Sequence, residues 1–351
     1  MCNLAGYAGN RQAAPILLEM LRKQQAYNGG KSTGIATIHE GKIYMRKIVG
    51  NVDDLIRNTD TLSLPGTIGI AHSRPSGKPG MEEYAQPFLS MDGQSVLMTN
   101  GIQSAFCPYI GDWNKAVDLL VDNGYVFRTE TENPKGESPK RANGRFVNPP
   151  EARVNLVSYY LKEGKTATEA LALSCTHFYS DNVSVMMNAS QPDTIFACRT
   201  TRPMNVLVGK GETLLSTTPL AFPDDVSGEA YPLPLMYVCA VSAKGMTITA
   251  DRIDGETPSA VTPLVHQKAL PRVCALLQGK KDAPVLFDTI EIAIREEMKD
   301  IWPEQRYFQQ EARLAYDILQ QLADEGRLKQ GKFIYDHRDG PVEREFFWLE
   351  D

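Results

Sequence analysis

The chain has 351 residues, a net charge of -6, 42% hydrophobic residues and 23% charged residues. This is the composition of a globular protein long enough for a large core, and two domains are expected. The acidic balance argues against nucleic acid or an anionic membrane as a partner, and no apolar run has transmembrane length. The 6 cysteines lack metal-ligand spacing. We therefore expect reduced thiols, no metal, no cofactor, no signal peptide and a cytoplasmic location.

The first residues predict a short buried strand that starts at a cysteine. Cys2 stands directly behind the initiator methionine, and Leu4, Ala5 and Gly6 follow it. Because cysteine is small enough for removal of Met1, we expect a mature first residue that carries both an amine and a thiol. That amine is partly neutral at cellular pH and can take the proton of the thiol. The alternative is a tolerated small residue in a frayed terminus.

Hydrophobic periodicity and turn residues predict blocks of strands and paired helices up to about residue 251. The predicted helices cover residues 13–25, 52–58, 113–123, 150–163 and 167–175. The later predicted strands cover residues 33–39, 42–49, 67–72, 95–99, 182–188, 194–199, 205–209, 213–217, 236–242 and 246–249. Such blocks favour an α+β fold with two antiparallel sheets layered between helices.

Two loops differ from the rest of this region. Residues 73–80 follow a buried strand and are rich in glycine, proline and polar side chains, which is typical of a mobile binding loop on a rigid strand. Residues 133–150 combine prolines, glycines, lysines and arginines without periodicity. We expect a flexible cationic insertion there, which could form a lid or a docking arm.

The last part of the chain, residues 254–351, is expected to form a second module. Prolines punctuate its start, and helices are predicted at residues 287–298 and 305–324. A hairpin follows, with strands near residues 332–335 and 342–349. This order is that of a winged-helix module, and a helical cap with a hairpin is the alternative. Acidic residues outnumber basic ones from residue 284 onwards, which favours contact with protein rather than DNA.

Several short motifs occur in a characteristic order after Cys2. They are GIAHSR at 69–74, TNGI at 99–102, GYVF at 124–127, ETE at 130–132 and LSTTPLA at 215–221. Together they resemble the glutaminase domain of the class II glutamine amidotransferases, the N-terminal nucleophile type, and above all that of glucosamine–fructose-6-phosphate aminotransferase. The segment AQPF at 85–88 is more similar to the amidophosphoribosyltransferase branch. The resemblance implies a four-layer αββα sandwich over residues 1–253.

The resemblance also implies a chemical role for three of these residues. Cys2 would attack the side-chain amide carbon of glutamine. Asn100, through its side chain, and Gly101, through its main-chain N–H, would stabilise the oxyanion that forms. Ammonia would then pass to a separate acceptor enzyme, because nothing after residue 251 resembles an acceptor domain.

Three further residues would hold the substrate. Arg74 would bind the α-carboxylate with a forked pair of hydrogen bonds, Ser76 would belong to the same substrate site, and Glu132 would bind the α-ammonium. The residues after Arg74 depart from the family pattern, since Pro75, Gly77 and Lys78 replace its aromatic, threonine and histidine. The loop is therefore expected to close differently.

Two other functions stay open. The chain could be an amidohydrolase of the same fold that acts on another γ-glutamyl or small amide, as the altered loop allows. It could also be a catalytically silent binding or regulatory protein, which retention of Met1 would favour. The expected partners are L-glutamine and a protein that accepts ammonia, without nucleic acid or membrane. Homo-oligomerisation is left open.

Overall fold

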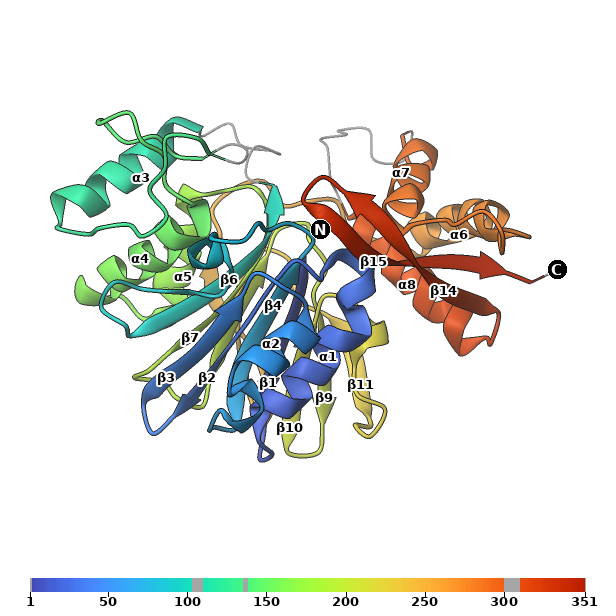
Figure 1. Ribbon diagram of the computed structural model, residues 1–351, viewed down its shortest axis with the longest axis horizontal. Coiled ribbons are helices and arrows are strands. Elements are labelled where there is room, and N and C mark those ends of the chain that lie inside the picture. Colours follow the sequence, from blue (N-terminus) through green and yellow to red (C-terminus); the bar gives the residue numbers. More distant parts are fainter. Residues whose placement is uncertain (1, 103–109, 135–137, 300–309, 351) are drawn as a thin grey trace.

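The computed structural model describes residues 2–102, 110–134, 138–299 and 310–350. Two sheets form its centre, one with strand order β11-β9-β10-β1-β4-β2-β3 and one with order β13-β12-β8-β7-β6-β5 (Figure 1). The first sheet contains β1 (Asn3–Ala8), β2 (Ser32–His39), β3 (Lys42–Ile48), β4 (Ile68–Arg74), β9 (Asn205–Gly209), β10 (Glu212–Ser216) and β11 (Gly228–Pro232). The second contains β5 (Phe88–Leu89), β6 (Ser95–Ile102), β7 (Asp181–Asn188), β8 (Ile195–Arg199), β12 (Tyr237–Ser242) and β13 (Gly245–Arg252).

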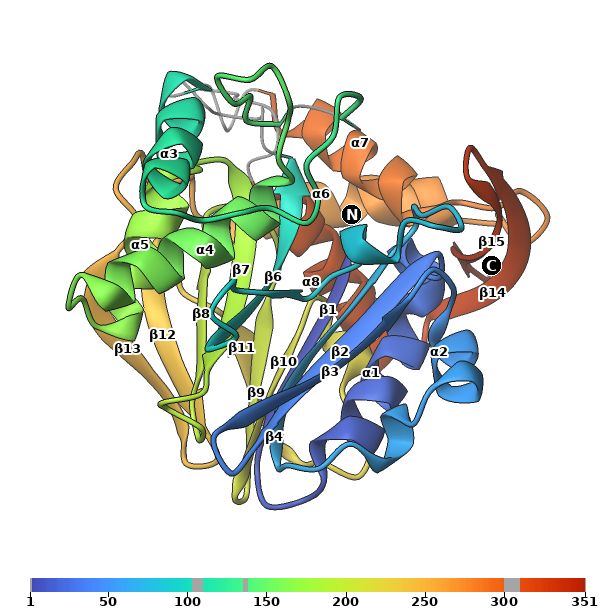
Figure 2. The same cartoon turned by 60° about the vertical axis from the view of Figure 1, so that its left-hand side comes forward.

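Helices cover the outer face of each sheet. The first sheet packs against α1 (Ala13–Asn28) and α2 (Val52–Asn58), and the second against α4 (Pro149–Lys162) and α5 (Ala167–His177). Further out, α3 (Ile110–Asp122) packs on α4. Figure 2 shows these helices on opposite sides of the paired sheets. None of the helices in the described ranges is both long enough and apolar enough to cross a membrane.

The period of two along a strand explains the layering. In β1, Leu4 and Ala8 belong to the cluster between the two sheets, whereas Ala5 and Tyr7 belong to the cluster under α1. All four side chains are at most 1% exposed, so β1 is a central strand buried on both faces. Because a strand of this kind cannot fray, the residue at its start is held in place.

The mixed α+β architecture expected from the sequence is confirmed. Two strands escaped the sequence analysis for different reasons. β5 has only 2 residues, which is too short for a periodicity. β11 reads Gly-Glu-Ala-Tyr-Pro and is an edge strand, so its pattern is not that of a half-buried strand. Residues 135–137 of the cationic insertion lie outside the described residues.

In its described residues, the last part of the chain holds three helices and a hairpin. They are α6 (Pro263–Leu277), α7 (Phe287–Glu297), α8 (Glu311–Asp324), β14 (Leu328–His337) and β15 (Gly340–Leu349). The helix predicted at residues 305–324 is described only from Glu311, because residues 300–309 lie outside the described residues. The two predicted helices and the hairpin are present in the expected order, but α6 was not predicted as a helix, because it contains Pro271 in a segment punctuated by prolines. The winged-helix assignment stays a prediction.

This C-terminal part packs against α1. The ring of Tyr27 stacks on Phe347 with centroids 5.6 Å apart and planes at 7°. One guanidinium nitrogen of Arg344 donates to the carbonyl oxygen of Gly29 at 3.3 Å. Tyr27 is buried in the same hydrophobic cluster as α6, α7 and α8. Contacts between residues more than 300 positions apart thus fix the hairpin beside the end of α1.

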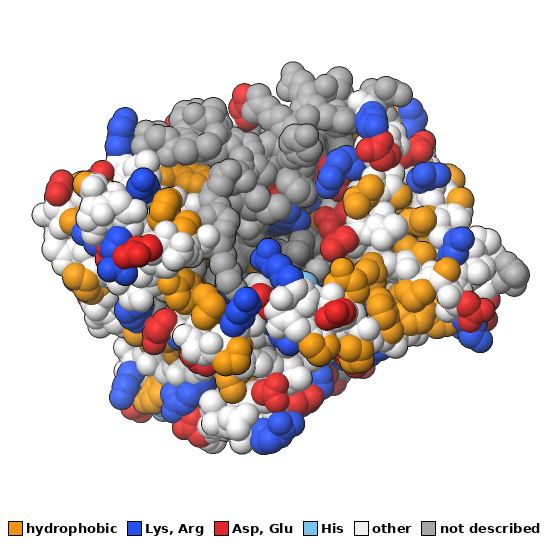
Figure 3. Space-filling model, turned by 45° about the horizontal axis from the view of Figure 1, so that its top comes forward, with side chains coloured by type: hydrophobic (Ala, Val, Ile, Leu, Met, Phe, Trp, Pro, Cys, Tyr) orange, Lys and Arg blue, Asp and Glu red, His pale blue; other side chains and the backbone are white. Residues whose placement is uncertain are grey.

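One face of the hairpin carries aromatic side chains that water reaches. Phe346 stacks on Trp348 with centroids 5.3 Å apart, and Phe333 meets both Phe346 and Tyr335 edge-on. Tyr335 is 41% exposed. Hydrophobic side chains gather over this part of the surface in Figure 3. The C-terminal part therefore presents an apolar surface as well as its excess of acidic residues.

Candidate active site

The register of β1 with β4 brings the first two candidate residues together. Asn3 pairs with Ser73, so Cys2 at the start of β1 lies beside Arg74 at the end of β4. Strand β6 brings Asn100 to the same place from the second sheet. The main-chain nitrogen of Cys2 donates to Asn100 Oδ1 at 3.0 Å, and Asn100 Nδ2 donates to the Cys2 carbonyl oxygen at 3.1 Å. Asn100 thus clamps the nucleophile candidate across the two sheets.

These two hydrogen bonds fix which way the Asn100 amide faces. Its oxygen accepts the Cys2 N–H, so its nitrogen must lie on the other side. An asparagine nitrogen carries two protons, and the Cys2 carbonyl takes one of them. No other group in the described part of the chain accepts the second proton. Because Asn100 is only 3% exposed, that proton lies in a site where water competes little for it.

Gly101 follows Asn100 at a point where only glycine fits. Its φ is +157°, and a Cβ added there would overlap the carbonyl oxygen of Asp181 on the neighbouring strand β7. The backbone of β6 therefore approaches β7 more closely than any side chain would allow. This packing holds the Gly101 main chain rigidly next to the Asn100 clamp.

The thiol of Cys2 is half-buried, and two cations lie near it. Burial raises the pKa of the Cys2 thiol, while Arg74 and Arg202 oppose that increase. A Cys2 thiol with a raised pKa is mainly protonated at neutral pH, so it needs a nearby base to become a nucleophile. The arrangement is thus suited to a thiol activated during the reaction and not to a standing thiolate.

Arg202 belongs to a buried ion-pair network that sequence analysis missed. It lies 2.5 Å from Asp181 Oδ2 and 3.7 Å from Glu291 Oε1, and all three side chains are at most 10% exposed. Asp181 opens β7, whereas Glu291 belongs to α7. The network therefore connects the strand beside Gly101 with a helix of the C-terminal part.

The loop after β4 folds back on Arg74. Arg74 Nε donates to the Ser76 carbonyl oxygen at 3.1 Å, and Ser32 Oγ donates to the same oxygen at 2.8 Å. Ser76 thus takes part through its main chain. Within the described ranges, Nε is the only nitrogen of the Arg74 guanidinium that makes a hydrogen bond. The two terminal nitrogens remain for a carboxylate.

Glu132 is not part of this cluster of contacts. Its side chain is exposed, and within the described ranges it makes no hydrogen bond or ion pair. The neighbouring acid Glu130 is engaged instead, 2.7 Å from Arg141 and 2.9 Å from Asn143. Burial raises the pKa of Glu130, but the bonds from Asn143 and Arg141 outweigh it and lower the pKa overall. The insertion is therefore tied to the body through Glu130, and the substrate role of Glu132 stays a prediction.

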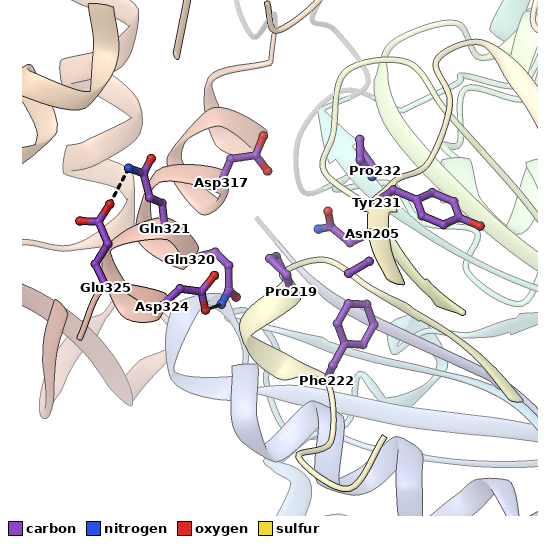
Figure 4. Close-up of a pocket in the computed structure, with 11 residues that line it drawn as sticks. Asn205, Pro219, Phe222, Tyr231, Pro232, Asp317, Gln320, Gln321, Asp324 and Glu325 are labelled. Atoms are coloured by element: carbon purple, nitrogen blue, oxygen red, sulfur yellow. Dashed lines mark hydrogen bonds between the residues drawn. The ribbon is translucent and has the colours of Figure 1, made fainter. Parts of the chain in front are cut away.

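A separate cavity of about 640 Å³ lies between α8 and the edge of the first sheet where β9 begins and β11 ends. Asp317, Gln320 and Gln321 line it from α8, and Asn205 and Tyr231 line it from the first sheet, with the Tyr231 ring pointing away from α8 (Figure 4). None of the six candidate site residues lines this cavity. It marks the junction of the C-terminal part with the sheet and not the site around Cys2.

Comparison with known proteins adds a sequence relationship. No family model matches the chain. The glutamine–fructose-6-phosphate aminotransferase (isomerizing) of Pyrococcus horikoshii is 29% identical over 224 residues, which are 63% of this chain and 33% of that enzyme. The enzyme of Caldanaerobacter subterraneus subsp. tengcongensis is 31% identical over 219 residues, which are 62% of this chain. That of Escherichia coli O6:H1 is 30% identical over 224 residues, which are 63% of this chain. The chain spans about a third of the length of these relatives.

Two solved structures share the fold. The glutamine phosphoribosylpyrophosphate amidotransferase from B. subtilis, complexed with ADP and GMP, has a TM-score of 0.58 and 15% identity over 85% of this chain and 64% of its own. The allosteric regulatory enzyme of purine biosynthesis has a TM-score of 0.57 and 16% identity over 77% of this chain and 52% of its own. The chain is thus similar in sequence to glutamine–fructose-6-phosphate aminotransferases and in fold to a glutamine amidotransferase. The resemblance expected from its motifs is confirmed.

The amidotransferase motifs identified Cys2, Asn100, Gly101 and Arg74 as candidate site residues, because these residues lie in short segments that follow one another in a recognisable order. The same motifs gave no sign of Arg202, Glu291 or Asp339. Arg202 follows β8 in a segment without a motif, and the other two belong to the C-terminal part. Only the folded chain brings these three charged residues close to the motif segments, Arg202 and Glu291 through the ion pairs described above and Asp339 through a hydrogen bond from the Gly77 N–H.

Proposed function

We propose that this chain is a glutamine amidotransferase subunit that hydrolyses the side-chain amide of glutamine and supplies ammonia to a separate acceptor enzyme. The observation that carries the proposal is the clamp of Cys2 by Asn100 beside Arg74. Removal of Met1 is part of it, because the main-chain nitrogen of Cys2 must become an amine. Residues 1–253 would form the glutaminase domain.

The proposed reaction moves one proton twice. The Cys2 amine takes the thiol proton while Sγ forms a bond to the amide carbon. The second N–H of Asn100 Nδ2 and the Gly101 N–H would stabilise the negative oxygen of the tetrahedral intermediate. The amine then returns its proton to the leaving nitrogen, the carbon–nitrogen bond breaks and ammonia departs. Water hydrolyses the thioester, which releases glutamate and restores the thiol.

The charged ends of glutamine would be held on the Arg74 side of the nucleophile. The terminal nitrogens of Arg74 suit the α-carboxylate, within a loop shaped by the Ser76 carbonyl oxygen. Glu132 remains the candidate for the α-ammonium, and its exposed carboxylate would be available to a substrate. The C-terminal part, residues 254–351, would dock the acceptor enzyme through its acidic and aromatic surface.

The test compares ammonia release from L-glutamine by the wild type and by Cys2→Ala. We expect a rate that depends on Cys2 and a purified chain whose intact mass lacks Met1. Cys274→Ala is the matched control, since Cys274 is also a partly exposed free thiol but lies in α6. Equal rates for wild type and Cys2→Ala, alone and with candidate acceptor enzymes, would leave the silent binding protein.

An amidohydrolase with another substrate is the second candidate. The exposed Glu132 favours it, because within the described ranges the predicted partner of the α-ammonium makes no hydrogen bond or ion pair that would orient its carboxylate. Ammonia release from γ-glutamyl amides and from small amides that lack the α-amino group separates the two functions. Faster release from those amides than from glutamine would favour the amidohydrolase.

A further inference from the structure

We propose that Asp339, in the turn of the C-terminal hairpin, is a positioning residue that holds the glutamine-binding loop in shape for Arg74. This inference rests on the proposed function. The turn between β14 and β15 is tight, because His337 pairs with Gly340 and leaves only Arg338 and Asp339 between the strands. The Asp339 side chain is 3% exposed although it stands at the tip of a hairpin. It is buried against the loop that follows Arg74.

The contacts of Asp339 are directed at that loop. Asp339 Oδ2 accepts the main-chain N–H of Gly77 at 3.1 Å, and Oδ1 lies 3.9 Å from Lys78 Nζ. A carboxylate that accepts a main-chain N–H forms one of the stronger hydrogen bonds in proteins. These two loop residues are among the three, with Pro75, at which the sequence departs from the amidotransferase pattern. The loop residues that depart from the amidotransferase pattern therefore contact Asp339 of the same chain.

The bond to Gly77 and the bond that orients Arg74 act on neighbouring atoms. Arg74 Nε donates to the carbonyl oxygen of Ser76, and the N–H of Gly77 belongs to the same peptide group. That peptide is thus held by Arg74 and Ser32 on its oxygen side and by Asp339 on its nitrogen side. Loss of Asp339 frees one side and lets the peptide rotate, which changes where the Arg74 guanidinium points.

The hairpin is itself anchored firmly enough to serve as a support. Phe347 stacks on Tyr27, Arg344 donates to the Gly29 carbonyl oxygen, and the N–H of Phe347 donates to the Val285 carbonyl oxygen at 3.0 Å. Gly29 lies just before the segment whose Lys31 N–H donates to the Arg74 carbonyl oxygen at 2.9 Å. The C-terminal part and the strand end that carries Arg74 therefore both bond to the segment of residues 29–31. A segment outside the glutaminase-like region completes the substrate site.

The experiment measures kcat and KM for L-glutamine in the full-length wild type, Asp339→Ala, Asp339→Asn and Asp336→Ala. Asp336 is the control, since it lies on the same hairpin but is exposed. We expect Asp339→Ala to raise KM roughly tenfold or more with little change in kcat, the size of one lost hydrogen bond to a charged group. Asp339→Asn keeps an oxygen for the Gly77 N–H and should recover part of the loss.

Alkylation of Cys2 distinguishes a positioning role from general loosening of the fold. Iodoacetamide needs no Arg74, so it should label Cys2 equally fast in all four proteins. A diazo-ketone analogue of glutamine should label the Asp339→Ala protein more slowly than the wild type. If Asp339→Ala matches Asp336→Ala in KM, or lowers KM by releasing the loop, the positioning role is wrong while the proposed function stands. A wild type that neither releases ammonia from glutamine nor reacts with the analogue overturns both.

Discussion

Replacement of Asn100 by alanine is the sharpest test of the proposed chemistry. The variant loses both hydrogen bonds to the Cys2 main chain, at 3.0 and 3.1 Å, together with the second N–H of Nδ2, which we propose stabilises the oxyanion. Removal of one preorganised oxyanion donor raises the barrier by about 2.7–4 kcal/mol. At 1.36 kcal/mol per factor of ten, kcat should fall by roughly 10²–10³. The lost anchoring of Cys2 adds to this decrease.

A second substitution separates anchoring from oxyanion stabilisation. Asn100→Asp keeps an oxygen for the Cys2 nitrogen but has no N–H, and it places negative charge where the oxyanion forms. We therefore expect its kcat to fall at least as far as that of Asn100→Ala. Asn188→Ala is the matched control, because Asn188 is also buried, at 3% exposure, but lies at the other end of β7 and donates to Ser95 Oγ.

The assay is ammonia release from L-glutamine at saturating substrate, with folding checked by thermal unfolding. Asn188→Ala should lose stability and keep its kcat. The reasoning is refuted if Asn100→Ala turns over glutamine at the wild-type kcat while Cys2→Ala is inactive. In that case the oxyanion donors must come from elsewhere in the site.

Three further predictions concern the surroundings of Cys2. Gly101→Ala should lower Tm by several degrees and abolish activity, because its Cβ would overlap the Asp181 carbonyl oxygen; a wild-type Tm in thermal unfolding would contradict this. Arg74→Lys should raise KM for glutamine about tenfold or more with little change in kcat, because a single ammonium cannot form the forked pair, and steady-state kinetics would detect the change. Burial raises the pKa of the Glu291 carboxyl to about 7. Between about pH 4.5 and 7 this carboxyl is therefore protonated in the folded chain and ionised in the unfolded chain. The free energy of unfolding should fall by roughly 3 kcal/mol as pH rises through this window. Denaturant unfolding at pH 5 and pH 8 should show a smaller decrease in Glu291→Gln than in the wild type, with the remainder due to groups such as Glu345, whose pKa is also raised to about 7 by burial. A pH dependence that is the same in both proteins would count against this prediction.

The sequence by itself determined most of the elements, the layered α+β class and the family resemblance. Strand and helix periods depend on which face of a local segment is buried, so they can be read within a window of about ten residues. The motifs around Cys2, Arg74 and Asn100 also lie at strand ends and loops, where residue type reflects chemistry more than packing. The sequence already predicted that those residues share a site, and the register of β1, β4 and β6 shows how they come together.

Only the tertiary structure decided which side chains surround that chemistry. Asp339 meets Gly77 across 262 positions of sequence, and Arg202 joins Asp181 to Glu291 on α7. No local pattern encodes such pairs, because each depends on how separately folded segments pack together. The same holds for Glu132, whose motif suggests a substrate contact while the packing of the insertion engages its neighbour Glu130. Local physics therefore specified the proposed nucleophile and its strand, and long-range packing specified what holds the loop after Arg74.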